Sequence, residues 1–275
     1  MDDHYLDYQV DGATAYGSDE VLLEKEDNLI AGTSWAGAGY TVAPFLADDS
    51  YETLLEAFKV NIHDVVKKFV GVSFEEFSLE KYHEFVRDDE THSKIVSVVR
   101  EGFPLAQFPI PLQRVENRVG ELCGIDATAF NPFRSDVHVY YIRIVRPQAK
   151  SDNNPPHRDP WLDFLKDAVN IFGPVAGCNL KSALPLIPGS HLWKESEIER
   201  TVAGARVDGM EYQVPAVTGM KRSERMIRPN PNRNQIMVFS PYLIHGGGTN
   251  LNADVTRMSL EMRFWRKSKS IPNYL

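Results

Sequence analysis

The chain has 275 residues, of which 43% are hydrophobic and 25% charged, and its 38 acidic against 30 basic residues give a net charge of −8. These proportions are ordinary for a globular protein, and the acidic balance argues against nonspecific nucleic-acid binding. No apolar run approaches the roughly 20 residues of a membrane span, and the polar, acidic N-terminus is unlike a signal peptide. We therefore expect a cytoplasmic protein that binds neither nucleic acid nor membrane, with Cys123 and Cys178 as structural thiols.

The first part of the chain, residues 1–130, is expected to be largely helical. Apolar side chains from Leu54 to Phe69 recur at helical spacing, with N-cap candidates at residues 48–50 and Gly71 just beyond the end. Further helices are expected over residues 79–86, 93–100 and 111–124, the last with Pro111 in its first turn.

The pattern changes to short strands after Asn131. Residues 137–145 are rich in β-branched and aromatic side chains, which favours a strand. More strands are expected over residues 168–172, 183–187, 235–239 and 256–265, with Gly and Pro between them. Helices followed by many short strands predict a mainly β fold with flanking helices, an antiparallel jelly roll. The polar residues 191–230 are expected to form a long loop or insertion, and such loops often cover a site.

Three residues have the types and order of a metal site. His157 and Asp159 lie two positions apart, so an extended backbone points both to one side and Arg158 to the other. With His245, two imidazoles and one carboxylate could cap one face of an octahedral metal and leave positions open, the ligand set of non-haem Fe(II) oxygenases. The His-x-Asp pair alone is a weak signal, because a solvated polar loop would also contain it.

The glycines after His245 allow a second interpretation. An apolar strand delivers the histidine, and Gly246, Gly247 and Gly248 let other groups approach the backbone closely. His-Gly-Gly-Gly is also an oxyanion-hole motif of α/β-hydrolase esterases. That interpretation needs a Gly-x-Ser-x-Gly nucleophile turn, which the sequence lacks.

Residues 256–264 alternate between polar and apolar side chains. Their polar face carries Arg257, Ser259, Glu261 and Arg263. This face could be solvated surface, or it could line a polar cavity inside a barrel. In a cavity, a guanidinium can bind a carboxylate through two parallel hydrogen bonds.

Together these segments resemble the Fe(II)/2-oxoglutarate-dependent dioxygenase superfamily, most closely its phytanoyl-CoA dioxygenase-like branch. Residues 183–191 resemble the branch's Ile-Pro-Gly-Ser-His segment, and residues 245–250 resemble its distal-histidine segment. Residues 257–259 are similar to the Arg-x-Ser pattern that holds 2-oxoglutarate in some relatives. The resemblance covers roughly residues 130–266.

The resemblance implies a single catalytic domain over residues 1–275, with a double-stranded β-helix, a cupin-like jelly roll, over residues 131–266. It implies that His157, Asp159 and His245 bind Fe(II). The co-substrates would be 2-oxoglutarate and O2, and the co-products succinate and CO2. The reaction would hydroxylate, or otherwise oxidise, a small molecule of secondary or carbohydrate metabolism. A carboxylate at position 159 favours hydroxylation over halogenation.

The resemblance leaves the co-substrate contacts less defined. Arg257 and Ser259 are expected to hold the far carboxylate of 2-oxoglutarate, although Arg263 shares their face and is an alternative anchor. Tyr141 and Arg143 share a face of the first core strand and could reach co-substrate or substrate. Beyond these, His191 is expected to be structural, and Trp161 is either an aromatic wall or a core residue.

Two other functions remain open at this point. The first is a non-catalytic jelly-roll protein that binds a small molecule or carbohydrate, in which His157, Asp159 and His245 never meet. The second is a cupin-type metalloenzyme without a keto-acid co-substrate. Anaerobic titration with Fe(II) and 2-oxoglutarate would distinguish these possibilities, because only the assembled chelate gives a weak visible charge-transfer band.

Overall fold

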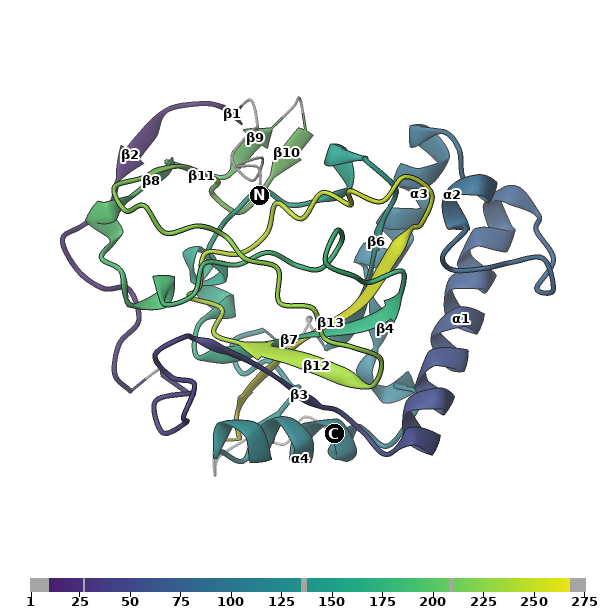
Figure 1. The fold of residues 1–275 in the computed structure, drawn as a ribbon, viewed down its shortest axis with the longest axis horizontal. Helices are drawn as coiled ribbons and strands as arrows, with labels where there is room; N and C mark the ends of the chain where they lie inside the picture. The colour runs from purple at the N-terminus through teal and green to yellow at the C-terminus, as the bar shows by residue number, and fades with distance from the viewer. Residues whose placement is uncertain (1–9, 27, 135–137, 208–209, 268–275) are drawn as a thin grey trace.

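The computed structural model describes residues 10–26, 28–134, 138–207 and 210–267. At its centre lies an antiparallel sheet with the strand order β3-β12-β7-β13-β6-β4 and with β5 beside β13 (Figure 1). The bounds of these strands are β3 (Tyr40–Pro44), β4 (Phe103–Pro104), β5 (Ala127–Thr128), β6 (Val139–Val145), β7 (Ala168–Ala176), β12 (Gln235–Phe239) and β13 (Arg257–Arg266). The fold is mainly β with flanking helices, a jelly roll, as the sequence predicted.

The helices α1 (Asp48–Val70), α2 (Tyr82–Phe85), α3 (Asp89–Arg100) and α4 (Leu112–Cys123) flank this sheet (Figure 1). Leu54 and Phe58 of α1 are buried in one core with Leu260 and Phe264 of β13. Burial of this apolar surface stabilises the packing of helix on sheet. None of the helices in the described part of the chain is long and apolar enough to cross a membrane.

The predicted helix boundaries were partly wrong. The N-cap of α1 is Ala47, so the acidic residues at 48 and 49 lie in the first turn. There they face the positive end of the helix dipole. At its end Gly71 adopts a left-handed conformation with φ of 68°, as expected for a C-cap. α2 is shorter than the predicted 79–86, because Lys81 and Tyr82 donate their N–H groups in turns to residues three positions earlier.

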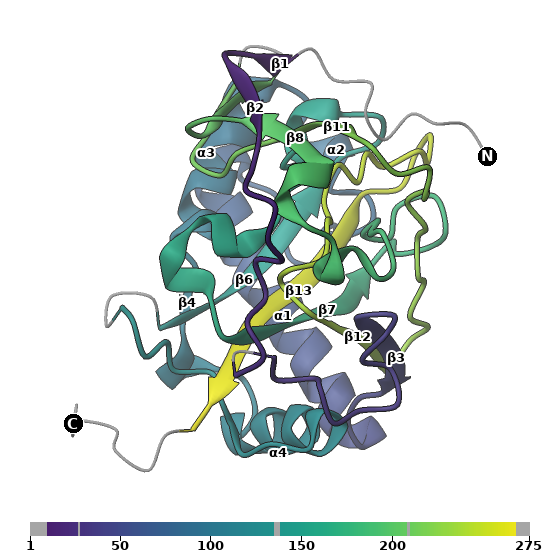
Figure 2. The same cartoon turned by 90° about the vertical axis from the view of Figure 1, so that its left-hand side faces the viewer.

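Two further, small sheets have the strand orders β1-β9-β10 and β11-β8-β2. Their strands are β1 (Val10–Asp11), β2 (Thr14–Tyr16), β8 (Ile198–Thr201), β9 (Ala205–Val207), β10 (Met210–Tyr212) and β11 (Val217–Met220). Figure 2 shows β2 alongside β8, although the two are far apart in the sequence. Of the two alternatives for residues 191–230, a long loop was therefore wrong, because β8 to β11 pair with one another and with the N-terminal β1 and β2, whereas an insertion stays a prediction.

The predicted strand over residues 183–187 was also wrong. Only Leu186 makes bridges there, to Ile227 and to His245. Pro185 and Pro188 flank it, and proline has no N–H group to donate to a ladder. Short 3-10 helices lie at Leu105–Gln107, Lys150–Asp152, Asp159–Trp161, Asp163–Leu165, Ser190–Leu192 and Glu195–Glu197.

The two faces of β13 differ in the way the alternation predicts. Met258, Leu260, Met262 and Phe264 are buried in the main core. The opposite, polar face is turned toward a cavity inside the jelly roll. The polar row of β13 is therefore an interior wall of the jelly roll.

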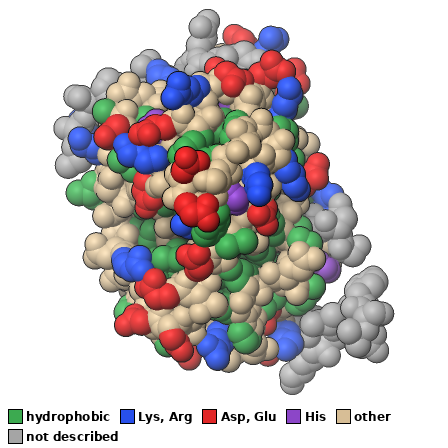
Figure 3. Space-filling model, turned by 90° about the vertical axis from the view of Figure 1, so that its right-hand side faces the viewer, with side chains coloured by type: hydrophobic (Ala, Val, Ile, Leu, Met, Phe, Trp, Pro, Cys, Tyr) green, Lys and Arg blue, Asp and Glu red, His purple; other side chains and the backbone are tan. Residues whose placement is uncertain are grey.

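On the outer face that carries α1 to α3, acidic and basic side chains are interspersed (Figure 3).

Candidate metal centre and adjoining cavities

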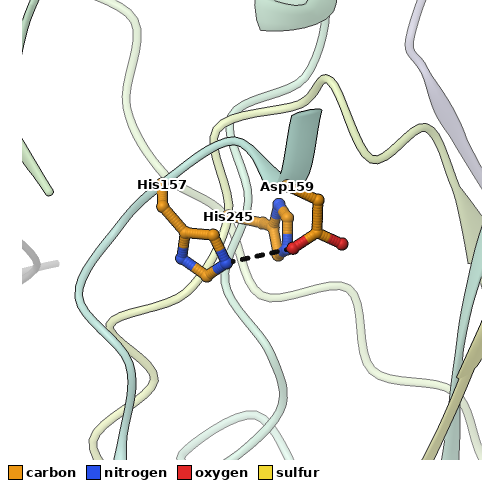
Figure 4. A group of neighbouring side chains, drawn as sticks. All are labelled: His157, Asp159 and His245. Atoms are coloured by element: carbon orange, nitrogen blue, oxygen red, sulfur yellow. Dashed lines mark hydrogen bonds and ion pairs between the residues drawn. The ribbon is translucent and has the colours of Figure 1, made fainter. Parts of the chain in front are cut away.

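His157 and His245 are brought together by a backbone bridge. The N–H of each residue donates to the carbonyl oxygen of the other, at 2.9 and 3.0 Å. The two rings lie side by side, with their centroids 4.6 Å apart. Asp159 follows two residues later, where its N–H donates to the carbonyl of Pro241 at 3.1 Å. The three side chains point toward one another, as Figure 4 shows.

Backbone hydrogen bonds to the two imidazoles leave the Nε2 atom of each ring facing Asp159. Nδ1 of His157 lies 2.7 Å from the Pro155 carbonyl, and Nδ1 of His245 lies 2.8 Å from the Leu243 carbonyl. A carbonyl only accepts hydrogen bonds, so each Nδ1 carries a proton and Nε2 is the ring nitrogen left for a metal. Burial lowers the pKa of His245 to about 4, so this ring is neutral at pH 7.

One oxygen of Asp159 faces both Nε2 atoms. Its Oδ1 lies 3.3 Å from His157 Nε2 and 3.8 Å from His245 Nε2. One ligand atom from each side chain lies within 4.8 Å of the others, and all three side chains are buried. Two buried imidazole nitrogens and a carboxylate oxygen at these distances form a donor set suited to a cation. A metal ion fits this donor set, which is the only such group found among the described residues.

The second oxygen of Asp159 is held by two other residues. Asn170 Nδ2 donates to Oδ2 at 2.7 Å, and Arg263 Nε donates to the same atom at 3.1 Å. Burial by itself would raise the pKa of Asp159, but Arg263 and the bond from His157 hold that pKa well below its usual range. Asp159 is therefore an anion with one oxygen left for a metal, and neither contact with Asp159 was predicted from the sequence.

The close approach behind His157 requires a glycine. Gly246 has a φ of 105°, and a Cβ there would lie 2.8 Å from the Pro155 carbonyl oxygen and 3.1 Å from His157 Nδ1. Any other residue would disturb the hydrogen bond that orients this ring.

Arg158 points away from the metal group, as predicted, into a buried network. Its side chain is 0% exposed and donates to Glu195 and to the Ser190 carbonyl. Ser190 Oγ also accepts from the N–H of Ile244, at 2.8 Å. Trp161 donates to Glu195 at 2.9 Å and does not line the cavity beside the metal group. This network joins the His-x-Asp segment to the segment after β12 that carries His245, which is not a strand but makes isolated bridges.

Arg257 lines the cavity beside the three residues and has no acidic partner among the described residues. Its side chain is 1% exposed, and it donates to Ser259 Oγ at 2.7 Å while its Nε finds no acceptor. Burial lowers the pKa of Arg257 to about 10, so it remains a cation at neutral pH. A buried cation without an acidic partner fits an anionic ligand, and the carboxylates of 2-oxoglutarate are such groups.

Arg143 lines the same cavity but is already paired. It donates through two nitrogens to the two oxygens of Glu261, at 2.8 and 3.0 Å. Tyr141 lies on a second, larger cavity, which shares Arg143, Glu261 and Arg263 with the first. The cavity volume is about 50 Å³ beside the metal group and about 540 Å³ for the larger one.

His191 has a separate role, as expected. Its Nε2 atom lies 2.9 Å from the Ala36 carbonyl oxygen. The ring is fully buried and is not part of the metal group. The arrangement as a whole is that of a mononuclear metalloenzyme: a jelly roll with a buried His-Asp-His group and an arginine suited to an acidic co-substrate. The alternative in which the three residues never meet does not hold.

Comparisons with known proteins agree with this class. The sequence profile of the family described as Phytanoyl-CoA dioxygenase matches residues 76–259. The chain belongs to this family and is an Fe(II)- and 2-oxoglutarate-dependent oxygenase that acts on a small molecule. A search of curated proteins returned no match.

Solved structures show a more distant likeness. The non-haem α-ketoglutarate-dependent epimerase SnoN from nogalamycin biosynthesis is 10% identical, with 88% of each chain covered and a TM-score of 0.44. AviO1 from Streptomyces viridochromogenes Tue57 is 14% identical over 88% of this chain and 99% of its own, with a TM-score of 0.48. EctD from S. alaskensis is 10% identical over 95% and 85%, with a TM-score of 0.48. At these values the structures say nothing about the substrate of this chain.

Proposed function

We propose that His157, Asp159 and His245 are the three protein ligands of the Fe(II), within a single catalytic domain over residues 1–275. The observation that carries this proposal is the convergence of three buried side chains, each of which offers one ligand atom within 4.8 Å of the others. Their Nδ1 bonds to backbone carbonyls orient both rings, which favours Nε2 ligation.

Arg257, with Ser259, is proposed as the anchor for the far carboxylate of 2-oxoglutarate. Arg257 is buried without an acidic partner, whereas Arg263 is already bound to Asp159 and Arg143 to Glu261. A free guanidinium can offer two parallel hydrogen bonds to a carboxylate. Tyr141 and Arg143 are then assigned to the substrate side of the site and not to the co-substrate.

The chain's own residues prepare the reaction. When bound, the iron and 2-oxoglutarate supply oxidation by O2, with release of succinate and CO2. Asp159 stays deprotonated because Arg263 offsets the effect of its burial on the pKa, and Asn170 and Arg263 keep one of its oxygens away from the metal. Leu184 and Phe239 line the cavity and exclude water from the co-substrate side.

The substrate is proposed to be a small molecule of secondary or carbohydrate metabolism, and the reaction a hydroxylation or a related oxidation. Asp159 supports this choice, because halogenation would need a free position where its carboxylate stands. A cytoplasmic location is proposed on the two free thiols, Cys123 and Cys178, which suit a reducing compartment.

A screen of candidate substrates for coupled succinate release, followed by product mass, tests this function. An increase of one oxygen atom in the product mass is expected for the hydroxylation. Asp159→Ala is the matched negative control, because it removes a metal ligand and leaves the apolar core untouched. Equal turnover in the wild type and in Asp159→Ala would contradict the proposed ligand set.

A further inference from the structure

The larger cavity lies between α3 and β6, next to the metal group. Its volume of about 540 Å³ falls in the range of roughly 300–1,000 Å³ that is typical of small-molecule sites. Arg143, Glu261 and Arg263 line both this cavity and the one beside the metal group. Arg263 itself lies 3.1 Å from Asp159. A molecule in the larger cavity therefore abuts the residues that hold the metal ligand.

Each guanidinium on the wall of this cavity already has a carboxylate. Arg143 is bound by Glu261 through two hydrogen bonds, at 2.8 and 3.0 Å. Arg146 pairs with Asp152 at 3.0 Å and with Asp89 at 2.7 Å. Arg263, the third arginine on the wall, pairs with Asp159 of the metal group at 3.1 Å. An anion that enters would find no free guanidinium to replace its hydration.

The uncommitted polar groups of the wall are hydroxyls and a carboxylate. Ser93 and Ser97 lie one turn apart on the same side of α3, and Glu211 of β10 lines the same cavity. In the described part of the chain, no hydrogen bond or ion pair involves these three side chains. They offer hydrogen bonds to hydroxyl or amine groups and repel a negative charge.

We propose that this cavity receives the substrate and selects against anions, an inference that rests on the proposed function. The substrate is then a neutral or amine-bearing polar molecule, and not an acyl-CoA thioester, whose phosphates carry several negative charges. The two positive charges of Fe(II) and the two negative charges of 2-oxoglutarate cancel, so loading the metal site does not alter this preference. Transfer of an unpaired anion into such a cavity is costly.

Charge selectivity can be measured without knowing the substrate. Ser97→Cys places a thiol in the cavity, and Val98→Cys, at a position that is 40% exposed and not part of the cavity wall, is the matched control on the same helix. Each variant is labelled with methanethiosulfonate ethylammonium and with methanethiosulfonate ethylsulfonate. The ratio of the two rates reports the local potential, because the intrinsic reactivity of the thiol is common to both reagents. Labelling of the wild-type thiols is measured and subtracted.

The reagents differ by two charges, so a potential of about −1 kT in the cavity gives roughly a 7-fold preference for the cation. We expect the cation-to-anion ratio to be at least about 5-fold higher for Ser97→Cys than for Val98→Cys, and to fall toward the control at high salt. An equal ratio, or faster labelling by the anion, would overturn the proposed selectivity.

A second variant tests the location of the substrate. Ser97→Trp fills the cavity from an exposed helix position, so succinate release that depends on the substrate found in the screen should be lost, while 2-oxoglutarate binding is kept. Val98→Trp is the control and should retain turnover. Coupled turnover by Ser97→Trp would show that the substrate binds elsewhere. The labelling needs no iron, so failure of the proposed oxygenase chemistry would appear in iron and 2-oxoglutarate binding and not in the labelling ratio.

Discussion

Replacing Arg257 with methionine should move two measurements in opposite directions. In the protein without ligands, the guanidinium is a buried cation with no carboxylate partner among the described residues. Burial lowers its pKa from 12.5 to about 10, and a difference of about 2.5 units corresponds to about 3 kcal/mol of lost stability. This cost is fully present below pH 10, where the folded protein keeps the proton, and fades as the pH rises toward 12.5. Arg257→Met should therefore raise the free energy of unfolding at pH 7, by up to about 3 kcal/mol.

The same substitution should weaken binding of the co-substrate. A hydrogen bond to a charged group contributes about 1.5–3 kcal/mol, and each 1.4 kcal/mol changes a dissociation constant tenfold. Loss of the guanidinium should therefore weaken 2-oxoglutarate binding by at least about 10-fold. Arg257→Lys should recover only part of the affinity, because an ammonium group cannot form the two parallel bonds. Iron affinity should change little, since Arg257 is not among the metal group.

Urea unfolding of the metal-free protein, in a buffer without carboxylate or phosphate, measures the free energy of unfolding. Anaerobic titration with 2-oxoglutarate at fixed Fe(II) measures the affinity for the co-substrate. Saturation at 100 times the dissociation constant should stabilise the wild type by about 2.7 kcal/mol and the variant much less. A less stable metal-free variant would mean that the guanidinium is already neutralised, and unchanged 2-oxoglutarate affinity would remove Arg257 from the site.

Three further substitutions test the surroundings of the site. Arg263→Ala should weaken metal binding about 10-fold, because it frees Asp159 on one side, and a larger effect on 2-oxoglutarate than on metal would make Arg263 the anchor instead. Gly246→Ala should impair metal binding and cost about 1–3 kcal/mol of stability, since its Cβ meets the carbonyl that orients His157, and wild-type values in calorimetry and metal titration would contradict this. Burial would raise the pKa of Asp152, but its histidine and arginine partners lower it from 3.8 to about 2, so the pairing adds about 2 kcal/mol above pH 3.8 that is lost as the pH falls toward 2. Asp152→Asn should therefore cost about 2 kcal/mol at pH 7 and much less at pH 2.5, as measured by urea unfolding, and an equal cost at both pH values would refute the linkage.

Local patterns were enough to predict the elements whose cause is local. The spacing from Leu54 to Phe69 and the stop at Gly71 gave α1, and the alternation from Arg257 onward gave β13 with its polar interior face. The placement of His157 beside His245 followed only from the order of motifs, because a backbone bridge between distant segments brings them together.

Features that depend on distant partners could not be predicted. β3 (Tyr40–Pro44) joins the main sheet by pairing with β12, and nothing in its own five residues signals that partner. Arg158 is a charged residue that sequence reasoning would place in water, yet Glu195 and two carbonyls keep it buried. The bond between Arg263 and Asp159 likewise depends on the register of β13 against β7, which sets where each side chain lies.

The most direct test of the central claim is an anaerobic titration of the protein with Fe(II) and then with 2-oxoglutarate, followed in the visible region. We predict a weak charge-transfer band that needs both additions and that is absent in His157→Ala, Asp159→Ala and His245→Ala. Arg257→Met should give the band only at much higher 2-oxoglutarate concentrations. Absence of the band in the wild-type protein, or an undiminished band in any one of the three ligand variants, would contradict the proposed metal centre.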